Sequence, residues 1–446
     1  MSRSYEFTAR VGKGLVLALC CAALLAGCGK TKKKDRLPGE RISVLAFDNT
    51  LSADPRLADV DVILPRPYVN PDWPEAGGYP GHAMHHLALD GPLERLWSVK
   101  IGKGGSRNKP LMTNPVVGDG RVFTIDPNAA VDAFDAASGK RLWKWRIKSE
   151  QESRAVAFGG GLAYAKGRVY ATTGYGYVVA IDAATGAELW RTNTGISLRG
   201  APTVRGGRLF APTYDGQLFA LSTDDGKVLW YHVAIAESAG MLGTASPAVT
   251  GNTVIAAFAS GELSALRVEN GRENWTDTLS RTGRTTPLAS ISDIDGLPVI
   301  DDGRLYAISH SGRMVAIDVR TGERVWERNI GGVQTPWIAG DFIYLVTNEG
   351  EVVCLAKRTG RVRWIKGLQR YEDPDDKKVI VRWSGPALGG DRLILVASNG
   401  YAISLSPYTG DILGALKISG RAFLPPIIAG NTLYILTNDG RLTAYR

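Results

Sequence analysis

Apolar positions along this chain form short runs that occur in pairs, each pair joined by a tight turn. Within residues 300–326, the runs Leu305–Ser309 and Met314–Ile317 are rich in residues that favour strands, and His310–Gly312 lies between them. Two such runs joined by a short glycine-containing turn predict a β-hairpin. A third run begins at Glu323. Each unit is therefore predicted to be an antiparallel sheet of at least three strands.

The hairpin pattern occurs eight times, and most copies follow an apolar segment that contains a proline. The hairpins are residues 121–134, 168–181, 208–221, 253–266, 305–317, 342–355, 392–405 and 432–444. The prolines are Pro115, Pro202, Pro247, Pro298, Pro336, Pro386 and Pro425. A proline is tolerated at the start of a strand. Each proline segment is therefore predicted to be a fourth, innermost strand beside a central channel.

A small residue, a glycine six positions later and a tryptophan four positions after that recur with constant spacing. The copies are Ala133/Gly139/Trp143, Ala180/Gly186/Trp190, Ala220/Gly226/Trp230, Ala265/Gly271/Trp275, Ala316/Gly322/Trp326, Cys354/Gly360/Trp364 and the degraded Ser404/Gly410/Gly414. A period of about 38 to 51 residues is typical of β-propeller blades. An aromatic residue at one fixed place in each unit predicts that the blades pack on one another there.

The two ends of the repeat region complement each other. The last hairpin ends at Arg446 without its tryptophan strand, while Leu93–Trp97 stands alone before the first complete unit. Pairing these two segments would complete a final blade and leave no open sheet edge at the junction. We therefore predict an all-β fold over residues 93–446, an eight-bladed β-propeller of four-stranded antiparallel blades, with the ring closed by its N- and C-terminal strands.

The N-terminus has the pattern of an export signal. Basic residues precede a short apolar run, Leu15–Leu25, as in a secretory signal peptide. At about 11 residues this run is too short to be a stable membrane span. The basic residues are Arg3, Arg10 and Lys13.

The apolar run ends in Leu25-Ala26-Gly27-Cys28, which resembles the bacterial lipobox. That resemblance implies removal of residues 1–27 as a lipoprotein signal peptide and attachment of lipid to Cys28. The alternative is an ordinary signal peptide that is cleaved elsewhere. Residue 29 is Gly, not the Asp that resembles an inner-membrane retention signal. We therefore expect a lipid anchor in the outer membrane, with the domain on its periplasmic face.

Residues 28–92 contain no repeat and are predicted to be the lipidated Cys28 followed by an extended, proline-rich linker. The chain has a net charge of +9, and loss of the signal peptide would leave +7. Much of this charge lies in residues 30–36, which could serve as a basic tether beside anionic headgroups or simply as a solvated spacer. Nucleic acid is a poor partner for an exported protein. After cleavage Cys354 would be the only thiol besides Cys28, and we expect it in the core.

Candidate chemistry outside the repeats is sparse. His82, His85 and His86 lie close together in the sequence and could supply metal ligands. The alternative is a loop that lies over the ring, because no carboxylate or thiol accompanies them. No nucleophile, base and acid set indicates a catalytic site. We therefore expect neither a metal nor a catalytic residue.

The phrase AxDxxTGxxxW, clearest at Ala180–Trp190 and Ala316–Trp326, resembles the repeat of pyrroloquinoline-quinone (PQQ) dehydrogenases over residues 93–446. Two families share that repeat. One comprises quinoprotein enzymes, and the other is the BamB family of the outer-membrane β-barrel assembly machinery, whose eight-bladed propellers carry no cofactor. Residues 72–78, DWPEAGG, resemble the opening phrase of the enzymes. The mature chain, however, has no adjacent pair of cysteines and no evident residue set for the Ca²⁺ that such a quinone needs.

Two local phrases favour the BamB family. Ile196–Gly200 resembles its LSLRG loop, and Ser292–Asp295, followed by Pro298-Val299, resembles its SDVD segment. The resemblance implies that both loops bind the periplasmic domains of the barrel insertase BamA. In that arrangement Ile196 and Leu198 would be apolar anchors, Arg199 a charged contact, and Asp293 and Asp295 its acidic neighbours. The alternative is an internal salt bridge that braces the two loops.

The resemblance implies a non-enzymatic scaffold lipoprotein of the outer-membrane β-barrel assembly complex. It would bind the insertase and assist the folding and insertion of outer-membrane proteins, without a cofactor. Its exposed propeller edges could in addition bind unfolded client strands. The alternatives are a PQQ-dependent periplasmic dehydrogenase and a propeller that serves another partner in the cell envelope.

Overall fold

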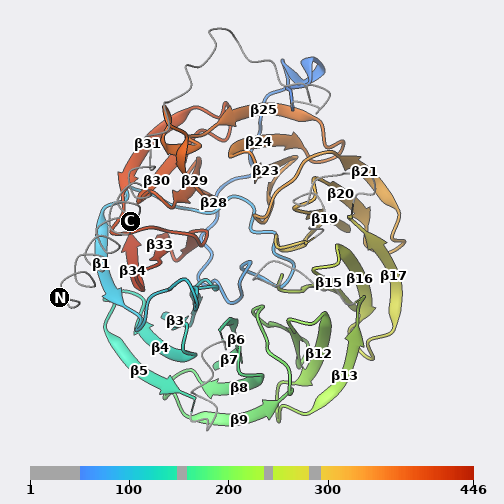
Figure 1. Cartoon of the computed structure of the whole chain (residues 1–446), viewed down its shortest axis with the longest axis vertical. Helices are drawn as coiled ribbons and strands as arrows, with labels where there is room; N and C mark the ends of the chain where they lie inside the picture. The colour runs from blue at the N-terminus through green and yellow to red at the C-terminus, as the bar shows by residue number, and fades with distance from the viewer. Residues whose placement is uncertain (1–50, 148–157, 236–244, 281–292) are drawn as a thin grey trace, which may run out of the picture. The chain divides into compact units, whose positions relative to one another are not determined.

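The computed structural model describes residues 51–147, 158–235, 245–280 and 293–446. These residues form eight four-stranded antiparallel sheets arranged as blades around a central axis (Figure 1). The prediction of an all-β, eight-bladed propeller is confirmed. Besides strands, the described part of the chain contains a short 3₁₀ helix, η1 (Pro55–Leu57), and none of its helices has the length and hydropathy of a membrane span. The predicted signal peptide and Cys28 lie outside the described residues.

Each blade runs outward from an inner strand at the channel to an outer strand at the rim, and in six of the eight blades the inner strand is the shorter of the two. Blades 1 to 4 are β2–β5 (Val116–Gly118, Arg121–Ile125, Ala130–Asp135, Arg141–Arg146), β6–β9 (Gly160–Ala165, Arg168–Thr173, Tyr177–Asp182, Glu188–Asn193), β10–β13 (Thr203–Arg205, Arg208–Pro212, Gln217–Ser222, Val228–Val233) and β14–β17 (Ala248–Thr250, Thr253–Ala257, Glu262–Arg267, Glu273–Thr278). Blades 5 to 7 are β18–β21 (Val299–Asp301, Arg304–Ile308, Met314–Asp318, Arg324–Arg328), β22–β25 (Trp337–Ala339, Phe342–Val346, Glu351–Ala356, Val362–Gly367) and β28–β31 (Trp383–Gly389, Arg392–Ala397, Tyr401–Leu405, Ile412–Lys417). A separate hairpin, β26 (Tyr371–Asp373) and β27 (Lys378–Ile380), joins blades 6 and 7.

Blade 8 joins the two ends of the described chain. It consists of β32 (Ile427–Ala429), β33 (Thr432–Thr437), β34 (Arg441–Tyr445) and β1 (Arg95–Lys100). In the antiparallel register Trp97 pairs with Ala444 and Val99 with Leu442. The first strand therefore completes the last blade, as the sequence predicted.

The repeated tryptophan docks seven of the eight blades on the next blade, which confirms its predicted role. The indole Nε1 donates to a backbone carbonyl of the following blade, and the ring lies against the repeat glycine of that blade. The donor–acceptor pairs are Trp97–Ala136, Trp143–Ala183, Trp190–Thr223, Trp230–Val268, Trp275–Val319, Trp326–Lys357 and Trp364–Pro407, at 2.8–3.1 Å. The glycines are Gly139, Gly186, Gly226, Gly271, Gly322, Gly360 and Gly410, all at positive φ. Glycine is needed there because a Cβ would overlap the indole.

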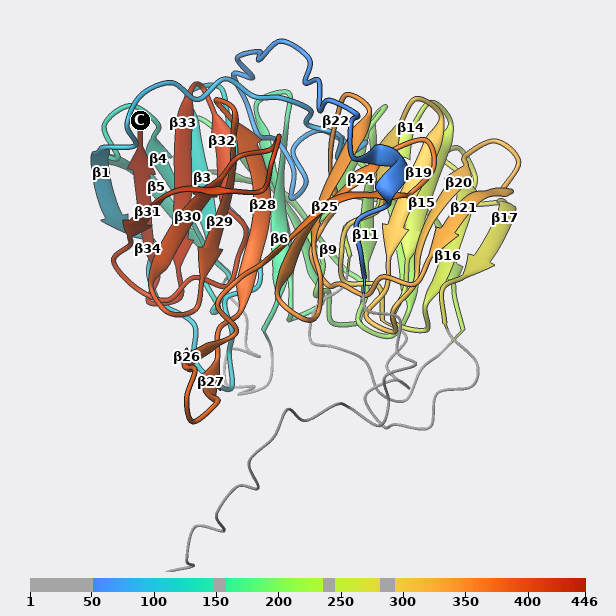
Figure 2. The same cartoon turned by 90° about the horizontal axis from the view of Figure 1, so that it is seen from above.

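Residues 70–90, which we call the strap, cross one end of the central channel (Figure 2). Their hydrogen bonds reach the innermost strand of every blade. The sequence predicted a linker here, whereas Trp73, Met84, Leu87 and Leu89 are buried in the core. The hydrogen-bonded pairs, in chain order of the strap, are Asn70–Gly430, Trp73–Val117, Pro74–Tyr164, Glu75–Val204, Pro80–Val249, Gly81–Ile300, His85–Trp337 and Leu87–Gly390. The strap thus contacts blade 8 first and then blades 1 to 7 in their order around the ring.

Glu75 is the strap residue that binds blade 3. Its Oε1 accepts a hydrogen bond from the backbone N–H of Val204 at 2.8 Å, and the side chain is buried. Burial raises the pKa of Glu75 from its ordinary value of 4.5 to about 8, although the Val204 hydrogen bond and the nearby Arg205 oppose this rise. The carboxyl is therefore protonated at neutral pH in the folded protein.

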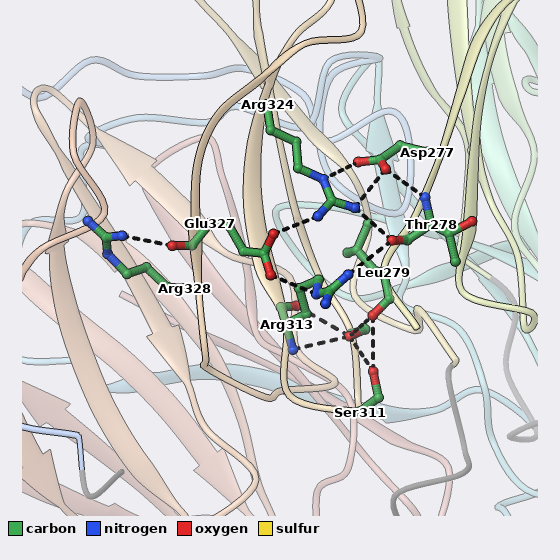
Figure 3. Close-up of polar contacts among 9 residues, drawn as sticks. Asp277, Thr278, Leu279, Ser311, Arg313, Arg324, Glu327 and Arg328 are labelled. Atoms are coloured by element: carbon green, nitrogen blue, oxygen red, sulfur yellow. Dashed lines mark hydrogen bonds and ion pairs between the residues drawn. The ribbon is translucent and has the colours of Figure 1, made fainter. Parts of the chain in front are cut away.

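An ion-pair network joins the outer strands of blades 4 and 5 (Figure 3). Arg324 of β21 lies 2.7 Å from Asp277 of β17 and 2.6 Å from Glu327. Arg313 lies 2.9 Å from the other oxygen of Glu327. Arg324 also donates to the carbonyl of Thr278. Charged side chains therefore cover this part of the rim.

Gly271→Ala tests the contact between tryptophan and glycine, with Gly303→Ala as a matched control. Both glycines have nearly the same φ, +71° and +72°, but a Cβ at Gly271 would lie 2.5 Å from Trp230, whereas a Cβ at Gly303 meets nothing within 4 Å. Gly303→Ala should lose about 1 kcal/mol from the left-handed conformation alone. Gly271→Ala should lose roughly 2 kcal/mol more, because the indole must move. Denaturant unfolding measures both, and equal losses would contradict the docking role.

Glu75→Gln tests the buried carboxyl of the strap. Between pH 4.5 and 8 the folded state keeps a proton that the unfolded state releases, so stability from this group is complete below pH 4.5 and falls as pH rises. The loss is up to about 1.4 kcal/mol per pH unit. Gln keeps an acceptor for Val204 without titrating, so the variant should gain stability relative to wild type between pH 5 and pH 8. Unfolding midpoints at both pH values measure this, and exposed Glu269→Gln is the control that should show no such gain.

Candidate partner-binding site at the central cavity

A cavity of about 820 Å³ occupies the channel. The strap contributes Trp73, Gly77 and His82 to its wall, and most of the remaining wall comes from the connections between successive blades. Those connections lead from the outer strand of one blade to the inner strand of the next, so they lie at the end of the channel opposite the strap. Arg199, between β9 and β10, and Asp295, between β17 and β18, both line this cavity. The structure therefore brings together one residue from each loop singled out in the sequence.

Arg199 lies between two aromatic rings. The centre of its guanidinium is 4.4 Å from the ring centroid of Phe158 and 3.8 Å from that of Tyr214. Such stacking orients the planar group by cation–π attraction and leaves its edges available for hydrogen bonds. Burial lowers the pKa of Arg199 from its ordinary value, which Tyr214 opposes, but the group stays charged at neutral pH.

Asp295 and Asp293 differ in their exposure. Asp293 is buried, and its backbone carbonyl accepts a hydrogen bond from His310 at 2.9 Å. Asp295 is half-buried, and burial together with the neighbouring Asp293 raises its pKa to about 7. Its Oδ1 is buried and has no hydrogen-bond partner within the described part of the chain. Asp295 is thus the acidic residue of this loop that faces the cavity.

The predicted alternative, an internal salt bridge between Arg199 and these aspartates, is not found. Among the described residues, the guanidinium of Arg199 stacks on Phe158 and Tyr214 and forms no ion pair with Asp293 or Asp295. Arg199 and Asp295, whose pKa is raised to about 7, therefore line one cavity without forming an ion pair with each other.

Ile196 and Leu198 also differ in the exposure of their side chains. Leu198 is fully buried in a cluster with Tyr170, Leu209 and Leu221, and it pairs with Thr213 in an isolated bridge. It therefore offers no surface to a partner in this conformation, and its role is to fix the loop. Ile196 is half-buried, and its carbonyl accepts a hydrogen bond from Thr194 Oγ1 at 3.0 Å. Of the two predicted anchors, Ile196 is the one that a partner can reach.

The three histidines of the strap do not converge. His82 Nδ1 lies 2.8 Å from the carbonyl of Pro298, and His86 Nδ1 lies 2.8 Å from that of Pro65. His85 lies 3.5 Å from Asp301. Nowhere in residues 51–147, 158–235, 245–280 and 293–446 do three or more His, Cys, Asp or Glu side chains gather as metal ligands.

The cavity wall does not fit the calcium ion that a quinone cofactor needs. Ca²⁺ takes about six to eight oxygen ligands, several of them from carboxylates. Among the described residues, the wall carries one carboxylate, Asp295, together with Arg107, Arg199 and Arg382. Positive charge therefore prevails where a calcium site would need oxygen ligands.

Sequence reasoning missed the aromatic partners of Arg199 and the role of the strap. Phe158 and Tyr214 lie in connections of different blades, and nothing in their local sequence indicates that they meet. In the strap, the sequence signal was the glycine pair Gly77 and Gly78. The structure shows why glycine is needed there: a Cβ at Gly77 would overlap His82, and a Cβ at Gly78 would overlap Met84. Paired glycines in a proline-rich segment indicate a tightly packed turn.

Comparisons with known proteins agree with this architecture. The sequence model of a family described as "Outer membrane protein assembly factor BamB" matches residues 127–366. A relative of that name from Moranella endobia is 26% identical over 358 residues, which is 79% of this chain and 89% of the relative.

Two solved structures share the fold. The crystal structure of BamB from Moraxella catarrhalis has a TM-score of 0.66 at 20% identity and covers 80% of this chain and 100% of its own. The quinohemoprotein alcohol dehydrogenase of Comamonas testosteroni has a TM-score of 0.64 at 14% identity, over 84% of this chain and 80% of its own. Both likenesses show the fold alone. Because the family model spans more than half of the sequence, the chain belongs to the BamB family of outer membrane protein assembly factors.

Proposed function

We propose that this protein is a non-enzymatic scaffold of the outer-membrane β-barrel assembly machinery, which binds the periplasmic domains of a BamA-type insertase. The observation that carries this proposal is that Arg199 and the carboxyl of Asp295, on two loops that line one cavity, form no ion pair with each other. A partner with a carboxylate for Arg199 and a donor for Asp295 would satisfy both groups. Membership of the family supports the choice of partner.

The surroundings of Arg199 suit it to recognition. The aromatic rings of Phe158 and Tyr214 hold the guanidinium in one orientation, so little freedom is lost when a carboxylate binds its edge. Ile196 adds an accessible apolar contact on the same loop, and Leu198 and Asp293 fix the two loops from inside. Charges at such a site determine register and orientation, while apolar contacts supply affinity.

The anchor is the second part of the proposal. Lipid on Cys28, after removal of residues 1–27, would confine the propeller to the periplasmic face of the outer membrane. Several acyl chains on one residue give stable anchoring where one chain does not. Confinement to one surface raises the local concentration of the scaffold near the insertase.

The enzymatic alternative has less support. The fold likeness to quinohemoprotein alcohol dehydrogenase stands at 14% identity, and one fold hosts unrelated activities. The residues that line the cavity are a poor match to calcium, as described above. A scaffold for a different envelope partner is the remaining alternative, and the identity of co-purifying proteins separates it from the first.

Arg199→Gln and Asp295→Asn should each weaken binding to the periplasmic domains of the insertase by about ten- to a hundred-fold, because each removes one charge of the site. Isothermal titration with the full-length protein in detergent measures the affinity. Exposed Arg320→Gln, which removes one positive charge outside the cavity, is the matched control and should bind like wild type.

Three other outcomes are informative. Equal binding by all variants would keep the partner and reject the site. Unfolding of Arg199→Gln, seen as a lowered melting temperature, would assign Arg199 a structural role. Failure of wild type to bind would reject the partner, and a rise in melting temperature with PQQ and Ca²⁺ would then support the dehydrogenase.

A further inference from the structure

The connection between blades 6 and 7 forms a hairpin of its own, β26–β27. Its two strands pair antiparallel, Tyr371 with Ile380 and Asp373 with Lys378. Among the described residues, no other connection between blades contains paired strands of its own. Figure 2 shows that the hairpin projects from the end of the propeller opposite the strap. It therefore stands at the same end as the connections that line the cavity.

The base of the hairpin is held by the core of the propeller. Val381 and Trp383, which follow β27, are both buried. The N–H of Val381 donates to the carbonyl of Arg370 at 2.9 Å, and the indole of Trp383 donates to the carbonyl of Gln369 at 2.9 Å. A segment that is fixed in this way loses little conformational freedom when it binds a partner.

The exposed part of the hairpin is apolar and strained. Val379 and Ile380 expose 55% and 61% of their surface. Val379 has a φ of +54°, and Lys377 has a φ of +52°. Such values are uncommon for residues other than glycine, and a β-branched residue there is a true outlier. Backbone strain of this kind occurs mainly at functional sites. The adjacent apolar pair thus has the character of a binding surface.

The hairpin lies across the channel from the loop that carries Arg199. That loop connects blades 2 and 3, whereas the hairpin connects blades 6 and 7. Connections four blades apart lie opposite each other in a ring of eight. Arg382, two residues after the end of β27, lines the same cavity as Arg199. A partner that covers the cavity from Arg199 to Arg382 therefore also reaches the hairpin.

The hairpin and the cavity wall differ in charge. Residues 371–380 contain two basic and four acidic side chains, so their net charge is 2 − 4 = −2. The described part of the cavity wall carries Arg107, Arg199 and Arg382 against one carboxyl group, that of Asp295. A complementary partner would place acidic groups over the cavity, and an apolar surface bordered by basic groups on the hairpin. Such an arrangement fixes the orientation of the partner.

We propose that the hairpin β26–β27 is a second binding element for the periplasmic domains of the insertase, with Val379 and Ile380 as its apolar contacts. The identity of the partner rests on the proposed function, whereas the surface itself rests on the exposure, strain and position of the hairpin. Contacts on opposite sides of the channel bind one partner at two points. Each contact then raises the effective concentration of the partner at the other.

Val379→Asn and Ile380→Asn test the hairpin in the full-length protein in detergent, by isothermal titration with the periplasmic domains of the insertase. Each should weaken binding about ten-fold, because an apolar contact is lost. Asn tolerates a positive φ better than Val, so Val379→Asn should not lower the melting temperature. Ile63→Asn is the matched control. Ile63 is 74% exposed and belongs to the segment that leads into the strap, so this variant should bind like wild type.

Amide hydrogen exchange provides a second readout. Residues 371–380 should gain protection when the insertase domains are added. The double variant Arg199→Gln/Ile380→Asn should lose about the product of the two single losses, because the two residues lie in separate connections. Wild-type affinity in both hairpin variants, or an equal loss of affinity in Ile63→Asn, would overturn the inference.

The remaining outcomes separate this inference from the proposed function. If Arg199→Gln weakens binding and both hairpin variants bind normally, the proposed function stands and the inference fails. If the hairpin variants weaken binding while Arg199→Gln and Asp295→Asn bind normally, the hairpin stands and the cavity site is rejected. If wild type does not bind the insertase domains, both fail. If wild type dimerises through the hairpin and Ile380→Asn is monomeric with unchanged insertase binding, a second copy of the chain covers the hairpin and the inference is wrong.

Discussion

Closure of the ring is the constraint on which the rest of this structure depends, because every blade must bury both of its faces against neighbours. Seven junctions use an indole seated on a glycine of the next blade. The eighth, between blades 7 and 8, has Gly414 in place of the tryptophan, and a Cβ there would meet nothing within 4 Å. At the channel end of this junction the strap supplies the missing contacts. Arg392 of blade 7 donates to the carbonyl of Leu89, and Asn431 of blade 8 accepts from the N–H of Asp90.

The propeller could be predicted from sequence because its determinants are local and repeated. Each hairpin carries its own turn, and the spacing from small residue to glycine to tryptophan is constant, so the blade count and the closing strand follow from the residues alone. The strap could not be predicted in this way. Its buried side chains, such as Trp73 and Met84, have no periodicity, and each of its hydrogen-bond partners lies in a different blade. Local sequence can indicate that such a segment is extended, but not where it lies.

The candidate site could be predicted only in part, because its geometry also depends on residues that lie elsewhere in the sequence. The resemblance of Ile196–Gly200 and of Ser292–Asp295 to family segments singled out two loops that line one cavity, but it did not separate side chains that face the cavity from those that face the core. Successive side chains of an extended segment point to opposite sides, so Leu198 lies inside while its neighbour Arg199 lines the cavity. The rings that orient Arg199 come from the connection between blades 1 and 2 and from a hairpin turn of blade 3, so the packing of consecutive blades brings them to it.

The order of contacts along the strap has a consequence for the time course of folding. The strap leaves the ribosome before any blade, yet its partners appear one after another. Sequence separation grows from 129 residues for Glu75 and Val204 to 252 for His85 and Trp337. Asn70, near the start of the strap, binds Ile428 at a separation of 358. Contacts between residues so far apart in the sequence are slow to form. The first part of the strap can bind its partner only after the last blade has been made, so the channel is sealed only when synthesis of the chain is almost complete.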